Sequence, residues 1–189
     1  MVWVAAAIGS LAFGVMLALG VVWGPKLMMV RGLEAGAANF ASSLLWLGLA
    51  SGCFITPWVS DKLGRRKLPI IVGMIVQVAA LALLLYAPPL GVGINLALCF
   101  AFGFGNSVHM LAFSVAGDVV EPETIGTSAA IVNGIMFILG GIMISRPGMR
   151  IGLGYTEGLI PASLELAQFA ARPLIISVSI ALIVSLFMR

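Results

Sequence analysis

Long apolar runs separated by short polar turns make up almost the whole of this chain. A helix that crosses a hydrocarbon core about 30 Å thick needs roughly 20 apolar residues. The pattern therefore predicts about six spans, at residues 3–24, 38–58, 68–86, 92–117, 125–145 and 172–188. Trp3 and Trp23 stand at the two ends of the first run, where amphipathic rings suit the two membrane–water interfaces. The predicted fold class is an all-α membrane protein, a single bundle of transmembrane helices.

Prolines and small residues refine the predicted helix boundaries. Pro25 and Pro57 are expected to end the first two spans, because proline lacks the N–H that continues a helix. Residues 146–172 form the longest segment that is not expected to span, and Ser163 is expected to cap a helix leading into the sixth span. The Gly48-x-x-x-Gly52 spacing predicts a close approach of two helices within the bundle.

The composition supports an integral membrane protein in contact with a lipid bilayer. Charged residues make up 9% of the chain and hydrophobic residues 61%, whereas a soluble domain carries about 25% charged residues. The cations are too few and too dispersed for a nucleic-acid partner. With one histidine and two separated cysteines, Cys53 and Cys99, the sequence predicts no metal site, no cofactor and no catalytic triad. No enzyme is expected, because the pattern shows no soluble domain that could hold an active site.

Two turns concentrate the charge that the apolar runs lack. Residues 60–68 read Ser-Asp-Lys-Leu-Gly-Arg-Arg-Lys-Leu and follow the second span. A purely acidic turn, with Asp118, Glu121 and Glu123, follows the fourth span. Because two predicted spans separate them, both turns face the same side of the membrane.

Counting the cations in the loops does not decide the orientation by the positive-inside rule, because both sides hold the same number. If both termini are cytoplasmic, the inside loops hold five cations, and so do the outside loops. The inside set is Lys62, Arg65, Arg66, Lys67 and Arg189, and the outside set is Lys26, Arg31, Arg146, Arg150 and Arg172. The density of the short basic turn favours the cytoplasm for that turn and for both termini, because short loops count most.

The charged turn resembles a known signature. Pro57-x-x-x-Asp61-Lys62-x-Gly64-Arg65-Arg66 is similar to the loop that the major facilitator superfamily carries between the second and third helices of each six-helix half. Pro57 replaces the usual opening glycine.

A second stretch carries the same resemblance. Residues 121–127, leading into Ala129, Ala130 and Asn133, resemble the turn between the tenth and eleventh helices of that superfamily. Ile125 stands where that turn often has arginine. The resemblance implies the C-terminal half of a twelve-helix transporter, built as a 3+3 inverted repeat.

The resemblance also assigns roles to these residues. In relatives the two turns form ionic latches that are made and broken as the transporter changes state. It implies a gating loop in which Arg65 or Arg66 pairs with an acid of the second turn. The expected gating residues are Asp61, Lys62, Gly64, Arg65, Arg66, Asp118, Glu121 and Glu123.

Polar residues inside the spans are the candidates for a substrate site, because burying them in lipid is costly. Asn106, Ser107 and His109 cluster on the fourth span, and Asn133 lies on the fifth. His109 is the only histidine and the one near-neutral titrating group that this half could contribute to proton coupling. The alternative for His109 and Asn133 is a hydrogen bond to a neighbouring helix.

These features predict half of a secondary active transporter that moves a small polar metabolite by alternating access, with proton coupling as an option. Its partners would be the substrate and either the missing N-terminal half or a second copy of the chain. The expected location is the bacterial inner membrane. The alternatives are a self-complementing homodimeric carrier and a truncated or non-transporting membrane scaffold.

Overall fold

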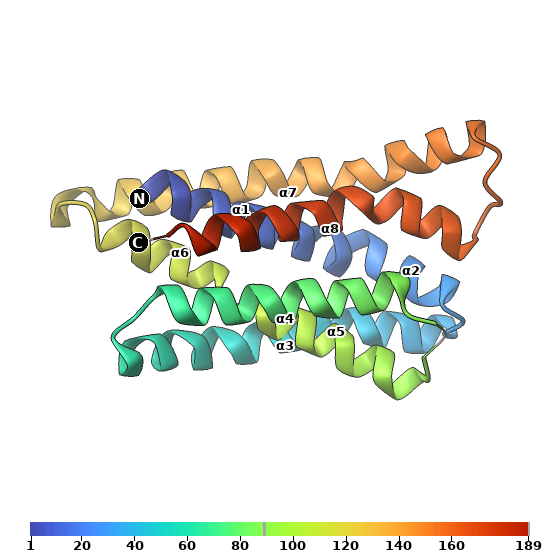
Figure 1. Cartoon of the computed structure of the whole chain (residues 1–189), viewed down its shortest axis with the longest axis horizontal. Coiled ribbons are helices and arrows are strands. Elements are labelled where there is room, and N and C mark those ends of the chain that lie inside the picture. Colours follow the sequence, from blue (N-terminus) through green and yellow to red (C-terminus); the bar gives the residue numbers. More distant parts are fainter. Residues whose placement is uncertain (89, 189) are drawn as a thin grey trace.

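The computed structural model describes residues 1–88 and 90–188 as helices joined by short turns (Figure 1). Among them, six helical stretches are long and apolar enough to cross a membrane. They are Val2–Val30, Ala35–Leu63, Lys67–Tyr86, Val92–Gly117, Pro122–Thr156 and Leu164–Leu186. The prediction of an all-helical bundle with six spans is confirmed. Arg189, counted above among the inside cations, lies outside the described residues.

Two of the spans are divided into shorter helices. The first span comprises α1 (Val2–Leu17), the π-helical turn η1 (Ala18–Trp23) and α2 (Gly24–Val30). The second and third spans are α3 (Ala35–Leu63) and α4 (Lys67–Tyr86). The fourth comprises α5 (Val92–Asn106) and α6 (His109–Gly117). The short η2 (Pro122–Thr124) leads into α7 (Ile125–Thr156), and α8 (Leu164–Leu186) completes the bundle.

Several helices run further than the sequence predicts. The first span continues past Pro25 to Val30, α3 continues past Pro57 to Leu63, and α7 continues through Pro147 to Thr156. Much of the segment expected not to span is therefore helical. Inside a bilayer the backbone has no water to bond with, so a helix that loses one bond at a proline is favoured over an unpaired irregular segment.

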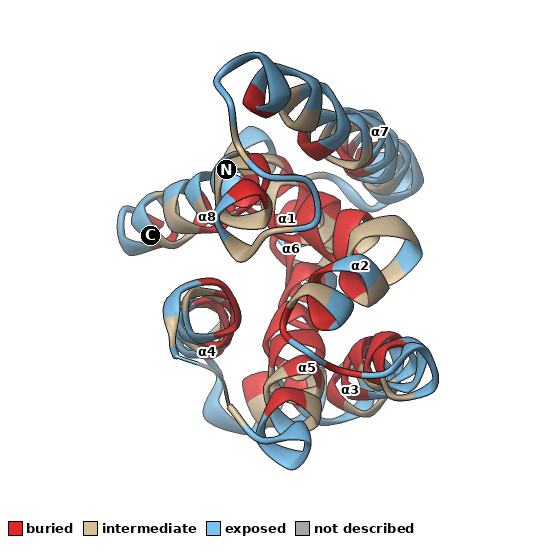
Figure 2. Cartoon of the chain, turned by 90° about the vertical axis from the view of Figure 1, so that its right-hand side faces the viewer, coloured by how far each residue is buried: buried red, intermediate tan, exposed pale blue. Residues whose placement is uncertain are grey.

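The bundle is organised around its first span. α1 packs against α6, α7 and α8, while α5 packs against α3 and α4. Figure 2 shows the buried residues concentrated on α1, α6 and α5, whereas α7 at the edge is mostly exposed. Gly48 of α3 and Gly103 of α5 allow a close approach, because a Cβ at either glycine would overlap a backbone carbonyl of the other helix. The close helix packing predicted from Gly48 is thus observed within the bundle.

The π-helical turn is stabilised by α3. A π-helix changes the usual i to i−4 bonding pattern and often marks a functional site. Here the Gly20 carbonyl accepts hydrogen bonds from Trp46 Nε1 at 3.1 Å and from Ser42 Oγ at 3.4 Å. The first two spans are therefore joined by side-chain bonds as well as by packing.

A buried arginine joins two turns at the end of the bundle that carries α2. Arg31 is only 8% exposed. Its Nε donates to Asn95 Oδ1 at 2.9 Å, and Nη1 donates to the Leu84 carbonyl at 2.9 Å. Further bonds reach the carbonyls of Ala87 at 3.3 Å and Pro88 at 3.2 Å. Arg31 thus caps the C-terminal end of α4, where the helix dipole favours a cation. Burial lowers the pKa of Arg31, but a guanidinium keeps its proton.

We predict that Arg31→Ala destabilises the bundle by about 1–3 kcal/mol, the cost of leaving buried acceptors without their donor. The measurement is the free energy of unfolding in bicelles. Arg146→Ala is the matched control, because Arg146 is an exposed arginine at the same end. Equal losses for the two variants would show that the Arg31 bonds contribute nothing specific.

Candidate functional site

The two charged turns meet at one end of the bundle. Figure 1 shows both termini at this end, together with the α3–α4 turn and the α6–α7 turn. α3 ends at Gly64, whose backbone is left-handed with φ +61°, as glycine permits. The chain then turns directly into α4, with Arg66 as the residue before its first turn.

Arg66 bonds to acids of both turns. Its Nη1 donates to the Asp61 carboxylate and, at 3.3 Å, to Ser60 Oγ. Its Nε donates to Asp118 Oδ2 at 3.2 Å, across to the end of α6. The hydrogen bond that Arg66 donates to Asp61 is the main reason that the pKa of Arg66 is raised, with a further contribution from Asp118. Arg66 is therefore the residue that links the basic turn with the acidic one.

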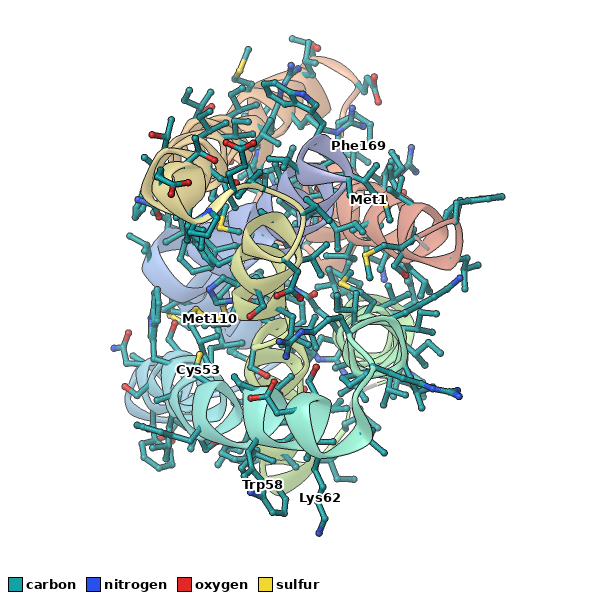
Figure 3. The ribbon with its side chains drawn as sticks, turned by 90° about the vertical axis from the view of Figure 1, so that its left-hand side faces the viewer. Met1, Cys53, Trp58, Lys62, Met110 and Phe169 are labelled. Carbon is teal, nitrogen blue, oxygen red and sulfur yellow. The ribbon has the colours of Figure 1, made fainter. Side chains whose placement is uncertain are left out.

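The other residues of the expected gating loop are arranged differently. Figure 3 looks onto this end and shows Lys62 beside Trp58, with the ammonium 5.1 Å from the ring centroid. Arg65, Glu121 and Glu123 form no ion pair within the part of the chain that the structure describes. Arg65, Arg66 and Asp118 also line a cavity of about 420 Å³ at this end.

The fourth span is broken near its middle. α5 ends at Asn106 and α6 begins at His109. The connecting turn is tightened, because the Ser107 N–H donates to the Phe104 carbonyl at 3.1 Å. Ser107 Oγ donates to that carbonyl at 2.7 Å and lies 2.6 Å from Thr56 Oγ1. A hydroxyl has one proton, so Thr56 is the donor to Ser107. The break is thereby attached to α3.

His109 lies beneath an aromatic surface. It is 6% exposed, and its ring stacks on Phe13 with centroids 4.6 Å apart. Phe13 in turn meets the exposed Phe137 of α7 edge-on at 6.0 Å. His109 Nδ1 lies 2.8 Å from the Asn106 carbonyl oxygen. A carbonyl only accepts, so Nδ1 carries the proton, and in the neutral ring Nε2 is left as an acceptor.

Asn106 is the least satisfied polar residue at the break. Its side chain is completely buried, and neither its amide nitrogen nor its oxygen has a hydrogen-bond partner among the described residues. Gln77 of α4, which donates to the Ala12 carbonyl at 3.1 Å, leaves its own oxygen unpaired. A buried unpaired polar group costs about 1–3 kcal/mol. These amides are therefore groups that a water or a polar ligand would satisfy.

Asn133 does not join this cluster. It lies on an exposed face of α7, while Asn106, Ser107 and His109 are buried at the break. Of the four residues proposed for substrate binding, the structure thus brings three together and places the fourth on a neighbouring surface.

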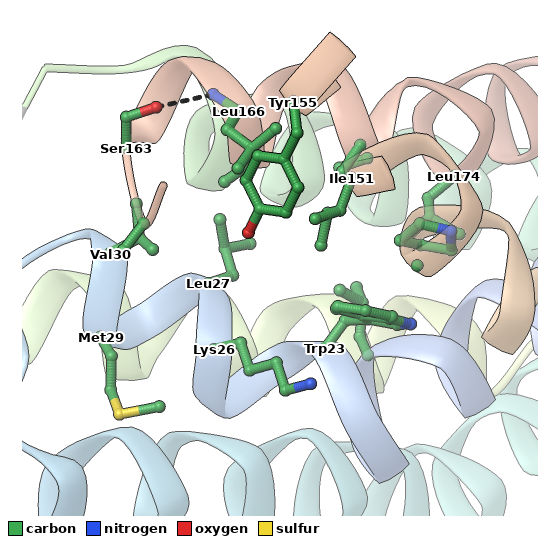
Figure 4. A pocket seen from close by; sticks show the side chains of 17 residues that line it. Trp23, Lys26, Leu27, Met29, Val30, Ile151, Tyr155, Ser163, Leu166 and Leu174 are labelled. Carbon is green, nitrogen blue, oxygen red and sulfur yellow. Dashed lines mark hydrogen bonds between the residues drawn. The ribbon is translucent and has the colours of Figure 1, made fainter. Parts of the chain in front are cut away.

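The larger cavity lies elsewhere. It measures about 660 Å³ and is formed by the first span, the C-terminal part of α7 and the N-terminal part of α8 (Figure 4). These segments lie at the end of the bundle opposite the charged turns (Figure 1). Sequence reasoning missed it, because it assigned residues 146–172 to a segment that does not span the membrane. The available signals were Trp23, Lys26 and Tyr155, which combine aromatic rings with a cation near a predicted interface.

Within the described residues, six apolar helices, a polar break in one span and charged turns at one end are typical of a polytopic transport protein. The family model of the Major Facilitator Superfamily matches residues 1–145. The chain belongs to this superfamily, whose members are transport proteins and not enzymes.

Two curated relatives agree with this assignment. The D-galactonate transporter of Escherichia coli O6:H1 is 26% identical over 172 residues, which cover 86% of this chain and 39% of the relative. The gentisate transporter of Corynebacterium glutamicum is 32% identical over 90 residues, covering 48% of this chain and 20% of the relative. The chain thus spans less than half the length of either relative that it matches. No solved structure matches the chain.

We predict that Arg66 and Asp118 are energetically coupled and that Arg65 and Asp118 are not. In a double-mutant cycle with alanine at both positions, the Arg66–Asp118 pair should show a coupling energy of about 0.2–1 kcal/mol, as expected for a partly exposed ion pair. The coupling should shrink as salt is added. The measurement is the free energy of unfolding in bicelles, and equal coupling energies for the two arginines would contradict the specific link.

Proposed function

We propose that this chain forms the C-terminal half of a secondary active transporter that moves a small organic acid by alternating access. Membership of the superfamily, the two transporter relatives and the half-length match support this proposal. The other half would be a second six-helix bundle. Together the two halves would enclose the substrate near the middle of the membrane.

The observation that carries the half-transporter proposal is the exposure of α7. Only 22% of the apolar window of this span is buried, against 61% for the first span. The exposed face includes the polar side chain of Asn133. A polar residue in contact with lipid is costly, so such residues usually face a protein interior or a water-filled cavity. A second bundle covering α7 removes Asn133 from lipid.

The substrate would meet the polar break of the fourth span. Asn106 offers an unpaired amide, Ser107 a hydroxyl and His109 an acceptor nitrogen in its neutral form, while Asn133 would complete the wall from α7. D-galactonate and gentisate, named for the two relatives, are small organic acids. We propose that the second half meets the negative charge of the substrate, or that His109 does so when its Nε2 is protonated.

The charged turns would act as the gate. Arg66 would hold the closed state of this end through Asp61 and Asp118, with Gly64 setting the turn. Lys62, Arg65, Glu121 and Glu123, which form no ion pair among the described residues, would form new pairs when the gate opens. By the density of positive charge, this end and both termini would be cytoplasmic, in the inner membrane of a bacterium, since both relatives are bacterial.

The test is uptake by vesicles that contain the chain alone or the chain with a six-helix N-terminal half. Labelled D-galactonate and gentisate are the substrates. We expect uptake only when both halves are present, because one half supplies one wall of the site. Uptake by the chain alone would support the homodimeric carrier in place of the half-transporter. Failure of uptake in the assembled form, with both halves folded, would support the non-transporting scaffold.

We predict that His109→Gln flattens the pH dependence of uptake in the assembled transporter. In a proton-coupled carrier uptake rises as the outside pH falls, and glutamine keeps a hydrogen-bonding side chain but cannot be protonated in this range. Gln168→Ala is the control. It removes a 2.7 Å bond to the Leu85 carbonyl away from the break, so it should lower uptake without changing the shape of the pH profile. An unchanged profile in His109→Gln would remove the proton role.

A further inference from the structure

The 660 Å³ cavity has an apolar lining. Leu19 and Leu27 from the first span, Ile151 from α7, and Leu166 and Leu174 from α8 contribute aliphatic side chains to it. Figure 4 shows Leu27 on one side of the cavity and Ile151 and Leu166 on the other. Cavities of roughly 300–1,000 Å³ with mostly apolar linings are typical of small-molecule sites.

Two polar groups on the lining lack strong partners. The Lys26 side chain lies 4.5 Å from the centroid of the Trp23 ring, and no carboxylate pairs with it among residues 1–88 and 90–188. The Tyr155 hydroxyl points toward Leu27 across the cavity. Ser163, a third polar residue of the lining, is already used, since its Oγ accepts the Leu166 N–H at 3.1 Å. The lining thus offers an ammonium and a phenol to a ligand.

One wall of the cavity is fixed by a hydrogen bond between spans. Trp23 Nε1 donates to the Ile144 carbonyl of α7 at 2.7 Å. This bond holds the indole in place and positions Lys26 above it. Trp3 and Trp23 are separated by about 30 Å along a helix at 1.5 Å per residue, so when Trp3 lies at one interface of the bilayer, Trp23 lies at the other. The cavity therefore sits at headgroup depth.

The charge at this end also favours an anion. The helix segments and turns on this side of the bundle carry more cations than acids. The cations are Lys26, Arg31, Arg146, Arg150 and Arg172, and the acids are Glu34, Glu157 and Glu165. The excess of positive charge attracts negatively charged headgroups within about 10 Å at moderate salt.

We propose that this cavity binds an anionic amphiphile, with its apolar body against the leucine and isoleucine side chains and its head beside Lys26 and Tyr155. The site is separate from the polar break and does not depend on the transport proposal. Two sources share this chemistry, namely an anionic membrane phospholipid and a free long-chain carboxylate. The experiment below distinguishes them.

The test uses quenching of tryptophan fluorescence by brominated amphiphiles, with the transporter in phosphatidylcholine nanodiscs together with any partner half. The contribution of Trp23 is the difference in quenched fluorescence between the unmodified protein and Trp23→Phe. The probes are dibromo-phosphatidylglycerol, dibromo-phosphatidylcholine and dibromostearate at equal mole fraction. We expect an anionic probe to quench Trp23 about fivefold more effectively than the zwitterionic one, the factor that one lysine near an anionic headgroup supplies.

Trp58 provides a matched control in the same molecule. Lys62 lies 5.1 Å from its ring, so the pair has the same chemistry, but neither residue lines a described cavity. The Trp58 signal, obtained with Trp58→Phe, should show a much smaller preference for anionic probes. Lys26→Gln should abolish the preference at Trp23, and Lys62→Gln should leave it intact.

A second variant tests the cavity independently of charge. Ala167→Phe places a large ring in the lining and should reduce quenching of Trp23 by the anionic probes, while Lys26 is retained. Quenching by phosphatidylglycerol identifies a lipid site, and quenching by stearate alone identifies a site for a free carboxylate. Equal preference at Trp23 and Trp58, or a preference that survives both Lys26→Gln and Ala167→Phe, would overturn the proposal.

Discussion

The rest of the structure depends on one constraint, namely that a backbone in hydrocarbon must satisfy its own hydrogen bonds. The constraint explains why α3, α7 and α8 continue through Pro57, Pro147 and Pro173. It also means that a segment that departs from the regular helix needs other hydrogen-bond partners. The π-helical turn at Gly20 is supported by two side chains of α3, and the break after Asn106 by Thr56 and Ser107. Both of these irregular segments lie where side chains provide bonding partners.

A second constraint, the cost of a charged side chain in hydrocarbon, favours charge at the two ends of the bundle. The two ends use their charges differently. Arg31 is buried, and its bonds go to Asn95 and to backbone carbonyls at the end of a helix. Among the described residues no carboxylate pairs with it. Arg66 is partly exposed and bonds to two carboxylates from different turns. Exposed ion pairs contribute little energy, which suits a contact that forms and breaks. One end of the bundle is thus fixed by a buried arginine, and the other is held by a weak pair.

The sequence predicted the number of spans and the charged turns, because both follow from hydropathy and local charge. It also identified Asn106, Ser107 and His109 as neighbours, since they are close along one helix. It did not reveal that a broken helix buries them, that Phe13 covers His109, or that Asn133 lies apart. Those facts depend on which helix faces which, and a uniformly apolar helix gives almost no signal for its orientation. The same limit hid the large cavity, whose walls come from three distant segments.

The burial pattern distinguishes the two kinds of surface that a membrane bundle can expose. An apolar surface facing lipid needs no partner, and the exposed leucines and isoleucines of α4 and α8 are consistent with that role. The exposed face of α7 differs, because it combines Asn133 with Gly134 and Gly141, beside which there is open space. Small residues permit close helix contact, and an amide is costly in lipid. A second bundle against this face would pack closely on the glycines and would remove the Asn133 amide from lipid. It would also lie beside the aromatic pair of Phe13 and Phe137 that separates His109 from the surface.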